Sequence, residues 1–360
     1  MGGRRESESA EAEIAALRAS ADSWKQKADQ KSRRVLSTDV LRQIFDLRVR
    51  TLPARTAIPP RERREAILRE VSPAYVAAAA KGPAVWGEHV HAMSVGDLKW
   101  WMPMVTPQAG GPSAAWIAKQ RFPYRALTQT RELAIGGIML DIGAHIGRMS
   151  IPRIVLGDIG AAYCAEPDPL NYACLVGNIV DNGLNGLLMP DWLAIGDHDG
   201  SALLHRADVS GRHHVLVGSN PTRDAPSGQL PQSPTGKVVE VPCLTLDTWL
   251  RRLRVDPDAV TFVKVDVQGY EMRVLQGASA LLAKGHAAWQ LEMDPAHLMA
   301  TGTSLADVCE KLRQHFTYFI DLNGAVTGPR QRMIQELPDG LAYLAGPLGK
   351  TDILVYCASR

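Results

Sequence analysis

The chain has 360 residues, of which 46% are hydrophobic and 22% charged, as is ordinary for a globular protein with one or two buried cores. Its formal net charge of +2 argues against the strongly basic surface of dedicated nucleic-acid binders, so no nucleic-acid partner is expected. The sequence has no run of about 18 apolar residues, so no membrane span is expected, and its N-terminus does not resemble a signal peptide.

Residues 1–35 are expected to form an N-terminal helical extension. Apolar residues recur there at alternating three- and four-residue spacing: Ile14, Leu17, Ala21, Trp24 and Ala28. The stripe lasts about two heptads, fewer than a convincing coiled coil needs. A solvated helix is the simpler interpretation, and a homodimer formed through this helix is the alternative.

Residues 36–132 are expected to form a mostly helical cap region. Breaks rich in proline or glycine lie at 51–60 and 104–116, and the segment 61–82 between them is expected to be helical, with residues 61–70 mixing both charge signs as an exposed helix face does.

From residue 133 to residue 360, short apolar runs alternate with helical stretches, which predicts crossover units and a parallel sheet. The last two apolar runs, 316–322 and 352–357, have no long helix between them and are expected to be antiparallel neighbours. Segment 210–237 interrupts the alternation and is expected to be a long functional loop. The runs on either side of it, "SALLHRA" and "KVVEVPCLTL", are expected to pair as a hairpin that carries this loop.

The five cysteines are scattered, and none forms a C-x-x-C pair: Cys164, Cys174, Cys243, Cys309 and Cys357. We therefore expect neither a zinc ribbon nor a disulfide framework, but free thiols in a reducing cytoplasm.

The stretch "LDIGAHIG" has the pattern of a strand, a tight turn and the start of a helix. Asp141 sits at the carboxyl end of the strand, where ligands of open α/β sheets bind. Gly143 allows a sharp turn, and Gly147 allows the helix to pack near the strand. The spacing G-x-H-x-G differs from the G-x-G-x-x-G that cradles a pyrophosphate, so a dinucleotide oxidoreductase is disfavoured.

The next strand, in "AAYCAEPDP", ends at Glu166. An acid at the end of the second strand can accept hydrogen bonds from both hydroxyls of a ribose, and a solvated strand-end carboxylate is the alternative. Acids at the tips of two consecutive strands favour a nucleoside-containing ligand.

Five segments in order resemble the FkbM-type S-adenosylmethionine-dependent methyltransferases: "DIGAHIG", "EPDPLNYACLVGNIVDNGL", "LAIGDHDGSALL", "VPCLTLDTWL" and "VKVDVQGYEMRVLQGA". The likeness spans residues 138–292. It implies an α/β class I methyltransferase (Rossmann-like) fold, with a seven-stranded, mostly parallel sheet and an antiparallel last strand, preceded by the helical N-terminal region. It also implies S-adenosylmethionine as cofactor.

The resemblance places Asp141, Gly143 and Gly147 in the cofactor loop and Glu166 on the ribose. For Asp168, a supporting contact and a helix N-cap are both open.

The resemblance also places Asp197 near the adenine, although a turn residue before Gly200 is equally compatible with the sequence. His145 stands where the family often has Asn, so it either contacts the methionine part of the cofactor or only fills the turn.

Three acids are candidates to take the proton of an alcohol or to hold its hydroxyl. Asp266 lies at the tip of the fourth strand, Glu271 opens the next helix, and Glu292 ends the fifth strand. For Glu271, an acid that only stabilises the helix N-terminus is the alternative. Histidines in or beside the long loop are further candidate bases: His205, His213 and His214.

A metal site is not favoured. Asp266, Glu292 and Asp294 could offer oxygen ligands to Mg²⁺, but the sequence lacks a clear adjacent pair of carboxylate and amide ligands. No metal is therefore expected among the site residues.

The expected activity is O-methylation of a hydroxyl on a sugar, a glycan or a natural product, with a small-molecule or glycan acceptor. N- or C-methylation and a non-enzymatic cofactor-binding scaffold are the alternatives.

Overall fold

The computed structural model describes residues 90–95, 98–103, 124–134, 136–206, 214–216, 238–322, 330–337 and 349–358. The predicted N-terminal helix and its homodimer, most of the predicted cap, and most of the 210–237 loop lie outside the described residues. Within the described part, no helix is long and apolar enough to cross a membrane.

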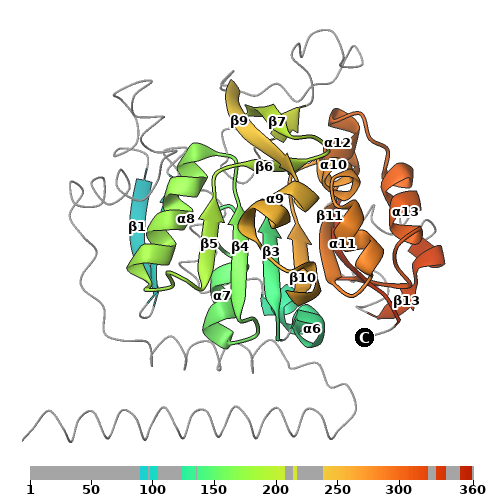
Figure 1. The fold of residues 1–360 in the computed structure, drawn as a ribbon, viewed down its shortest axis with the longest axis horizontal. Helices are drawn as coiled ribbons and strands as arrows, with labels where there is room; N and C mark the ends of the chain where they lie inside the picture. The colour runs from blue at the N-terminus through green and yellow to red at the C-terminus, as the bar shows by residue number, and fades with distance from the viewer. Residues whose placement is uncertain are drawn as a thin grey trace, which may run out of the picture. The chain divides into compact units, whose positions relative to one another are not determined.

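An eight-stranded sheet forms the centre of the fold (Figure 1). Its strands are, in spatial order, β13 (Gln331–Met333), β12 (Tyr318–Asp321), β14 (Thr351–Tyr356), β11 (Ala288–Met293), β10 (Val260–Val265), β3 (Ile138–Ile142), β4 (Ala161–Ala165) and β5 (Leu188–Asp191). The strands from β11 to β5 are parallel, and β14 is antiparallel to both β11 and β12. This confirms the predicted class I methyltransferase sheet of seven strands, to which β13 adds a short edge strand.

Helices cover both faces of this sheet. They are α6 (Tyr124–Ala134), α7 (Ser150–Leu156), α8 (Pro169–Asp181), α9 (Leu246–Leu253), α10 (Glu271–Gln276), α11 (Ser279–Lys284), α12 (Pro295–Ala300) and α13 (Leu305–Arg313). Single 3₁₀ turns lie at Pro257–Ala259 and Ile334–Glu336.

Alternation along β10 decides which residues meet which helices. Val263 and Val265 point to one face, where they share a core with Trp249 of α9 and with residues of α10, α11 and α13. Phe262 points to the other face, where the guanidinium of Arg153 in α7 lies 5.3 Å from the centre of its ring. Because both faces are covered, β10 is apolar at most positions.

A second, four-stranded sheet follows β5. Its order is β6 (Ala194–Gly196), β9 (Val238–Thr245), β7 (Gly200–His205) and β8 (His214–Leu216). The antiparallel pairing of β7 with β9 confirms the predicted hairpin at the base of the long loop. The segment 210–237 is not entirely without regular structure, because residues 214–216 pair with β7.

A β-hairpin lies in the region where a mostly helical cap was expected. It consists of β1 (Val90–Val95) and β2 (Leu98–Pro103), which pair antiparallel. Aromatic side chains favour strands, and Trp100 and Trp101 in β2 are fully buried. The one described helix of the predicted cap is α6.

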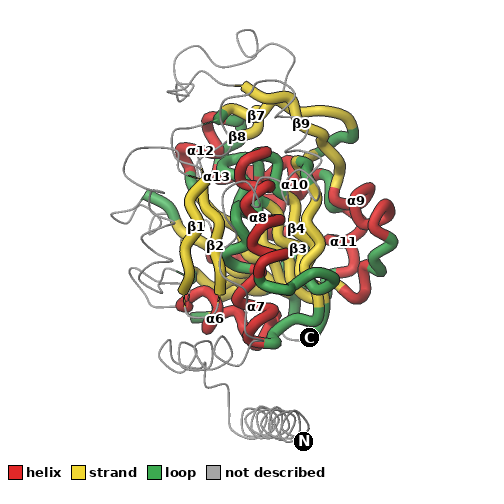
Figure 2. The backbone as a smooth tube through the Cα atoms, turned by 90° about the vertical axis from the view of Figure 1, so that its left-hand side faces the viewer, coloured by secondary structure: helices red, strands yellow, loops and turns green. Residues whose placement is uncertain are grey.

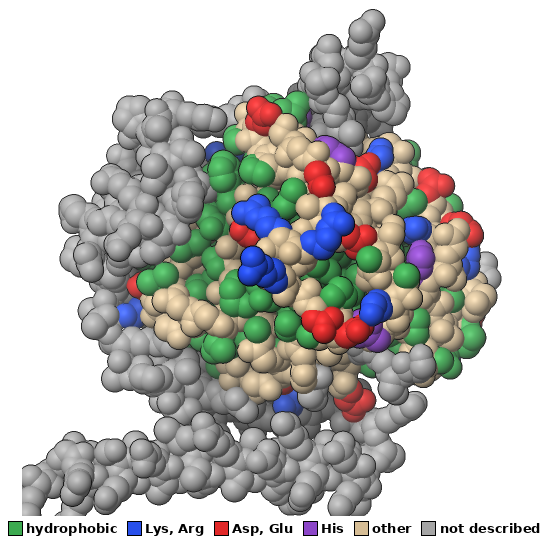
Figure 3. All heavy atoms as spheres, viewed as in Figure 1, with side chains coloured by type: hydrophobic (Ala, Val, Ile, Leu, Met, Phe, Trp, Pro, Cys, Tyr) green, Lys and Arg blue, Asp and Glu red, His purple; other side chains and the backbone are tan. Residues whose placement is uncertain are grey.

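The face seen in Figure 1 carries basic and acidic side chains interspersed with apolar ones (Figure 3). This mixture agrees with the small net charge of the sequence.

Candidate active site

The glycine turn, residues 143–147, leaves the carboxyl end of β3 in the predicted position. Gly143, His145 and Gly147 all have left-handed backbone conformations, with φ values of 76°, 53° and 88°. The N–H of Gly143 donates to the carbonyl of Ala165 over 3.0 Å, which ties the turn to the end of β4. A Cβ at position 143 would lie 1.9 Å from the carbonyl oxygen of Asp266, so only glycine fits between the turn and β10.

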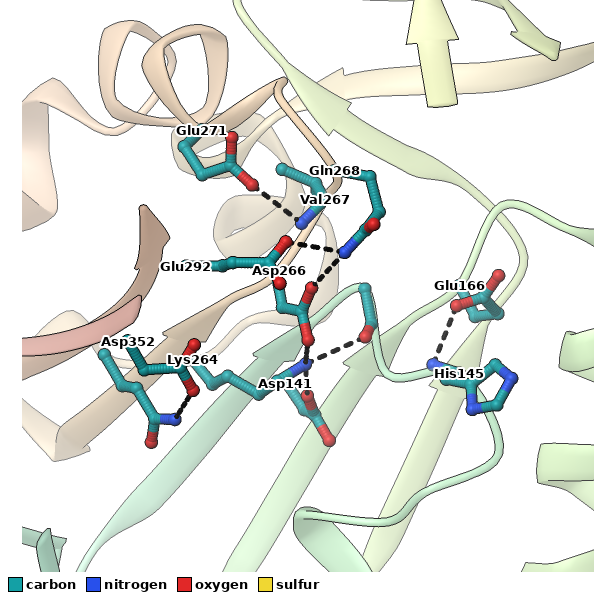
Figure 4. Close-up of polar contacts among 12 residues, drawn as sticks. Asp141, His145, Glu166, Lys264, Asp266, Val267, Gln268, Glu271, Glu292 and Asp352 are labelled. Carbon is teal, nitrogen blue, oxygen red and sulfur yellow. Dashed lines mark hydrogen bonds and ion pairs between the residues drawn. The ribbon is translucent and has the colours of Figure 1, made fainter. Parts of the chain in front are cut away.

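His145 contributes its backbone to this arrangement. Its N–H donates to Oε2 of Glu166 over 2.7 Å, whereas its imidazole points away from the acidic residues around Asp266 (Figure 4). Asn and His are among the non-glycine residues that best tolerate a left-handed φ. His145 can therefore adopt the left-handed φ of this position as well as the Asn that the family often has there. A contact between His145 and the methionine part of the cofactor stays a prediction.

Glu166 lies beside the glycine turn with its carboxylate held by three donors. Besides His145, the N–H of Asp168 donates to Oε1 over 3.0 Å, and the amide of Asn171 donates to Oε1 over 3.3 Å. Burial, followed by the charge of Asp168, raises the pKa of Glu166 to about 7. Oε1 already accepts two of these bonds and Oε2 accepts one, so Oε2 has capacity for a further hydrogen bond, and the expected ribose contact stays open as a prediction.

Asp168 caps helix α8. Its Oδ1 accepts from the N–H groups of Leu170 and Asn171, both over 2.9 Å, and Pro169 follows at the first helical position. Its Oδ2 lies 2.5 Å from Nε of Arg206. Of the two roles open for Asp168, the N-cap is therefore present in the structure.

Asp197 lies in the turn between β6 and β7, as a turn residue before Gly200 would. Its carboxylate contacts Nδ1 of His198 and Nη1 of Arg273, both over 2.9 Å. Burial works to raise the pKa of Asp197, but these two partners outweigh it and lower the pKa. A position near the adenine stays a prediction for this residue.

Lys264 of β10 joins the tips of the two central strands, and it was not predicted as a site residue. Its Nζ lies 3.3 Å from Oδ1 of Asp141 and 3.5 Å from Oδ2 of Asp266, and it donates to the carbonyl of Gly143 over 2.9 Å (Figure 4). The side chain of Asp141 is fully buried. Burial works to lower the pKa of Lys264, but the charges of the two aspartates outweigh it and raise the pKa.

Asp266 and Glu292 are brought together at this edge of the sheet by Gln268. The amide nitrogen of Gln268 donates to Oδ1 of Asp266 over 2.8 Å and to Oε2 of Glu292 over 2.7 Å (Figure 4). Glu292 also accepts from Nζ of Lys350 over 2.5 Å. The side chain of Asp266 is 39% exposed, and Asp266 therefore remains accessible to an acceptor.

The environment of Asp266 keeps it ionised at neutral pH. Burial on its own would raise the pKa of Asp266. The charge of Lys264 and the hydrogen bond from Gln268 outweigh burial, so the pKa of Asp266 is lowered overall. Asp266 is therefore suited to accept a hydrogen bond from a hydroxyl rather than to act as a strong base.

Glu271 is buried and faces backbone. Its Oε1 accepts from the N–H of Val267 over 3.1 Å, which braces the loop before α10 (Figure 4). Burial, followed by the charge of Glu292, raises the pKa of Glu271 to about 8. These contacts give Glu271 a structural role in the loop before α10, whereas stabilisation of the helix N-terminus and a role as proton acceptor both stay predictions.

Asp294 lies next to Glu292, because Nδ1 of His297 is 3.3 Å from Oδ2 of Asp294 and 3.9 Å from Oε2 of Glu292. Asp294 caps α12 by accepting from the N–H groups of Ala296 and His297. Among the described residues, no group of three His, Cys, Asp or Glu side chains is arranged to hold a metal ion. His205 ends β7, where burial lowers its pKa, and His214 begins β8, whereas His213 lies outside the described residues.

Comparison with known protein families gives a match for the segment that contains these residues. A family model described as the methyltransferase FkbM domain matches residues 141–319, about half of the chain. None of the curated proteins compared with the chain matches it.

Several solved structures resemble parts of the chain. An FkbM methyltransferase from Methylobacillus flagellatus KT is 15% identical over 61% of this chain and 44% of its own, with a TM-score of 0.36. Precorrin-6y C5,15-methyltransferase from Geobacter metallireducens GS-15 is 11% identical over 66% of this chain and 88% of its own, with a TM-score of 0.33. M. capricolum TrmK, in complex with S-adenosyl-homocysteine, is 13% identical over 54% of this chain and 58% of its own, with a TM-score of 0.27.

The matched part of this chain thus spans less than half the length of the Methylobacillus protein. The family model covers the segment that carries the glycine turn, Glu166 and Asp266. The chain therefore belongs to the FkbM family of S-adenosylmethionine-dependent methyltransferases.

Proposed function

We propose that this protein transfers a methyl group from S-adenosylmethionine to a hydroxyl oxygen of a sugar, a glycan or a natural product. One observation carries the proposal. Glu166 and Asp266 lie at the carboxyl ends of β4 and β10, the two strands that flank β3 and its glycine turn. Glu166, the proposed ribose acceptor, lies on one side of the turn, and the partly exposed carboxylate of Asp266 lies on the other.

The residues present fit the cofactor. Glu166 offers carboxylate oxygens beside the turn, which a ribose would need, and the tight turn at residues 143–147 would let backbone approach the cofactor closely. When bound, S-adenosylmethionine supplies a methyl group on a sulfonium, which is already activated for transfer.

The protein's share of the reaction is alignment, exclusion of water and acceptance of one proton. Asp266 would hold the acceptor hydroxyl by accepting its hydrogen bond, while Lys264 and Gln268 fix the orientation of the carboxylate. A methylated oxygen that still carries its proton is a strong acid, so a carboxylate of lowered pKa is basic enough to receive that proton. Glu292, which shares Gln268 with Asp266, is the second carboxylate within this arrangement.

Two variants test the two sides of the turn. Glu166→Ala is expected to weaken binding of S-adenosylhomocysteine, measured by titration calorimetry, because it removes the ribose acceptor. Asp266→Asn is expected to keep that affinity and to lower turnover by about 10²- to 10⁴-fold on a hydroxylated acceptor. Absence of binding to the wild type, or unchanged binding by Glu166→Ala, would overturn the proposal. Mass spectrometry of the product separates methylation at oxygen from methylation at nitrogen or carbon.

We place the protein in the cytoplasm and keep a homodimer through residues 1–35 as part of the proposal. The first point is supported by the five cysteines, which are all free, with four of them buried. The second rests on the heptad stripe of the sequence. Light scattering of the full chain and of a chain without residues 1–35 tests the dimer.

A further inference from the structure

Hairpin β1–β2 precedes the FkbM domain in the chain and packs along helix α8 (Figure 2). Helix α8 and its C-cap present two asparagines to β2, Asn178 and Asn182, whose exposed fractions are 0% and 1%. Buried amides of this kind need hydrogen-bond partners, and the backbone of β2 supplies them.

Each asparagine pairs with both backbone polar groups of one strand residue. Asn178 accepts from the N–H of Trp101 and donates to its carbonyl over 3.2 Å. Asn182 accepts from the N–H of Lys99 over 2.9 Å and donates to its carbonyl over 2.6 Å. The two amides therefore act as a neighbouring strand would act on this edge of β2.

The spacing of the two elements makes this pairing possible. Four residues along a helix advance about 6 Å, and two residues along a strand advance about 6.6 Å, so Asn178 and Asn182 match Trp101 and Lys99. Gly177 allows the close approach, because a Cβ there would lie 2.7 Å from Cδ2 of Trp101.

The two asparagines differ in one hydrogen bond. The amide of Asn178 also donates to the carbonyl of Ile146, over 2.8 Å, inside the glycine turn. The corresponding donor of Asn182 binds the carbonyl of Asn178 over 2.7 Å, within α8 itself. One buried amide thus joins the hairpin to the turn, whereas its neighbour joins the hairpin to the helix.

The glycine turn depends on such ties because His145 holds a left-handed backbone that costs free energy, and the two glycines are free to adopt other conformations. Lys264 holds the carbonyl of Gly143 at one end of the turn, and Asn178 holds the carbonyl of Ile146 near the other. We propose that Asn178 is a positioning residue that keeps the glycine turn in its cofactor-binding conformation and couples that conformation to the docking of hairpin β1–β2. The inference rests on the proposed function, since the turn is taken as the cofactor site.

A matched pair of variants of the full chain tests the inference. Asn178→Leu and Asn182→Leu each remove two hydrogen bonds to β2 and one further donor, so we expect similar falls in melting temperature. Affinity for S-adenosylhomocysteine is expected to fall about tenfold in Asn178→Leu, as loss of one buried hydrogen bond allows. In Asn182→Leu it is expected to stay within about twofold of the wild type, because the tie to Ile146 remains.

If the two variants bind S-adenosylhomocysteine with equal affinity, the proposed coupling is wrong, but the assignment of the cofactor site is unaffected. Absence of binding by the wild type would overturn the proposed function and this inference together. If Asn178→Leu does not fold, Asn178→Asp replaces it, with Asn182→Asp as its control, because aspartate retains the acceptor for the strand N–H.

Hydrogen exchange of the wild type provides a measurement that needs no variant. Coupling is reciprocal, so saturation with S-adenosylhomocysteine is expected to slow amide exchange in residues 98–103. An unchanged exchange rate in this segment would contradict the inference.

Discussion

Replacement of Lys264 with methionine tests whether the tips of β3 and β10 are held together by charge. The substitution keeps most of the volume of the side chain and removes its ammonium group. Asp141, which is fully buried, then loses a cation 3.3 Å from its carboxylate, and the carbonyl of Gly143 loses a donor at 2.9 Å.

The structure sets the size of the expected effect. At an effective dielectric constant of about 20, two unit charges 3.3 Å apart attract each other by about 5 kcal/mol, before the cost of removing them from water is counted. Removal of one partner from a buried pair typically costs about 3–5 kcal/mol. Asp266 adds little, because its side chain is 39% exposed and solvent screens its charge. We expect Lys264→Met to lower the free energy of unfolding by about 3–5 kcal/mol.

Urea unfolding of four proteins measures this: the wild type, Lys264→Met, Asp141→Asn and the double variant. The double variant is expected to be more stable than Lys264→Met, because it contains no unpaired buried charge. A loss below about 1 kcal/mol in Lys264→Met, the range of a surface ion pair, would refute the reasoning. So would a double variant that is less stable than Lys264→Met.

Three other predictions concern the turn and the buried acids. Gly143→Ala is expected to abolish cofactor binding in calorimetry, because the new Cβ would meet the carbonyl of Asp266. Gly186→Ala is the control: Gly186 has a similar positive φ, but nothing lies within 4 Å of the position of its Cβ, so this variant should bind normally. The pKa of Glu166 is raised to about 7, and a protonated carboxyl accepts fewer hydrogen bonds. Affinity for S-adenosylhomocysteine is therefore expected to fall as the pH drops below about 7. An affinity that stays constant between about pH 6 and about pH 8 would contradict this. The pKa of Glu271, raised to about 8, means that the folded state holds a proton that the unfolded state has released, so stability falls as the pH rises from about 4.5 to about 8. Glu271→Gln should make the fall shallower in urea unfolding measured across the range, with the remainder due to other buried acids such as Glu166, and an unchanged slope would count against the buried proton.

The sequence predicted the strand tips of the site correctly, because that signal is local. An apolar run followed by an acid and a turn marks Asp141, Glu166, Asp266 and Glu292, and the structure places all four at strand ends. The expected mostly parallel sheet with an antiparallel last strand followed from the family resemblance and is confirmed.

The partners of these acids could not be predicted, because they come from distant parts of the chain. Lys264 and Asp141 are far apart in sequence, and their contact depends on the register between β10 and β3. A signal for Lys264 was present, since a lysine in the apolar run "TFVKVD" needs a buried anion. Asn178 gave no such signal, because its partners lie in β2 and in the glycine turn.

Hairpin β1–β2 was missed although its connection carries a recognisable pattern. Gly96 and Asp97 separate two runs that favour strands, and a two-residue connection beginning with glycine is typical of a tight hairpin. The helical interpretation of residues 36–132 came from their charged and alanine-rich segments, and it overlooked the tryptophan pair at 100–101.

The order of strands in the central sheet has a consequence for synthesis of the chain. β14 comes after every other strand described here, yet it lies between β11 and β12 rather than at an edge. Among the described strands, β12 pairs only with β13 and β14, so no pairing between these strands joins it to the rest of the sheet until residues 351–356 have been made. Until then, β11 has an open edge that can pair with another chain. Residues 351–356 therefore close the interior of the sheet, and the facing edges of β11 and β12 are exposed to mispairing until this segment is in place.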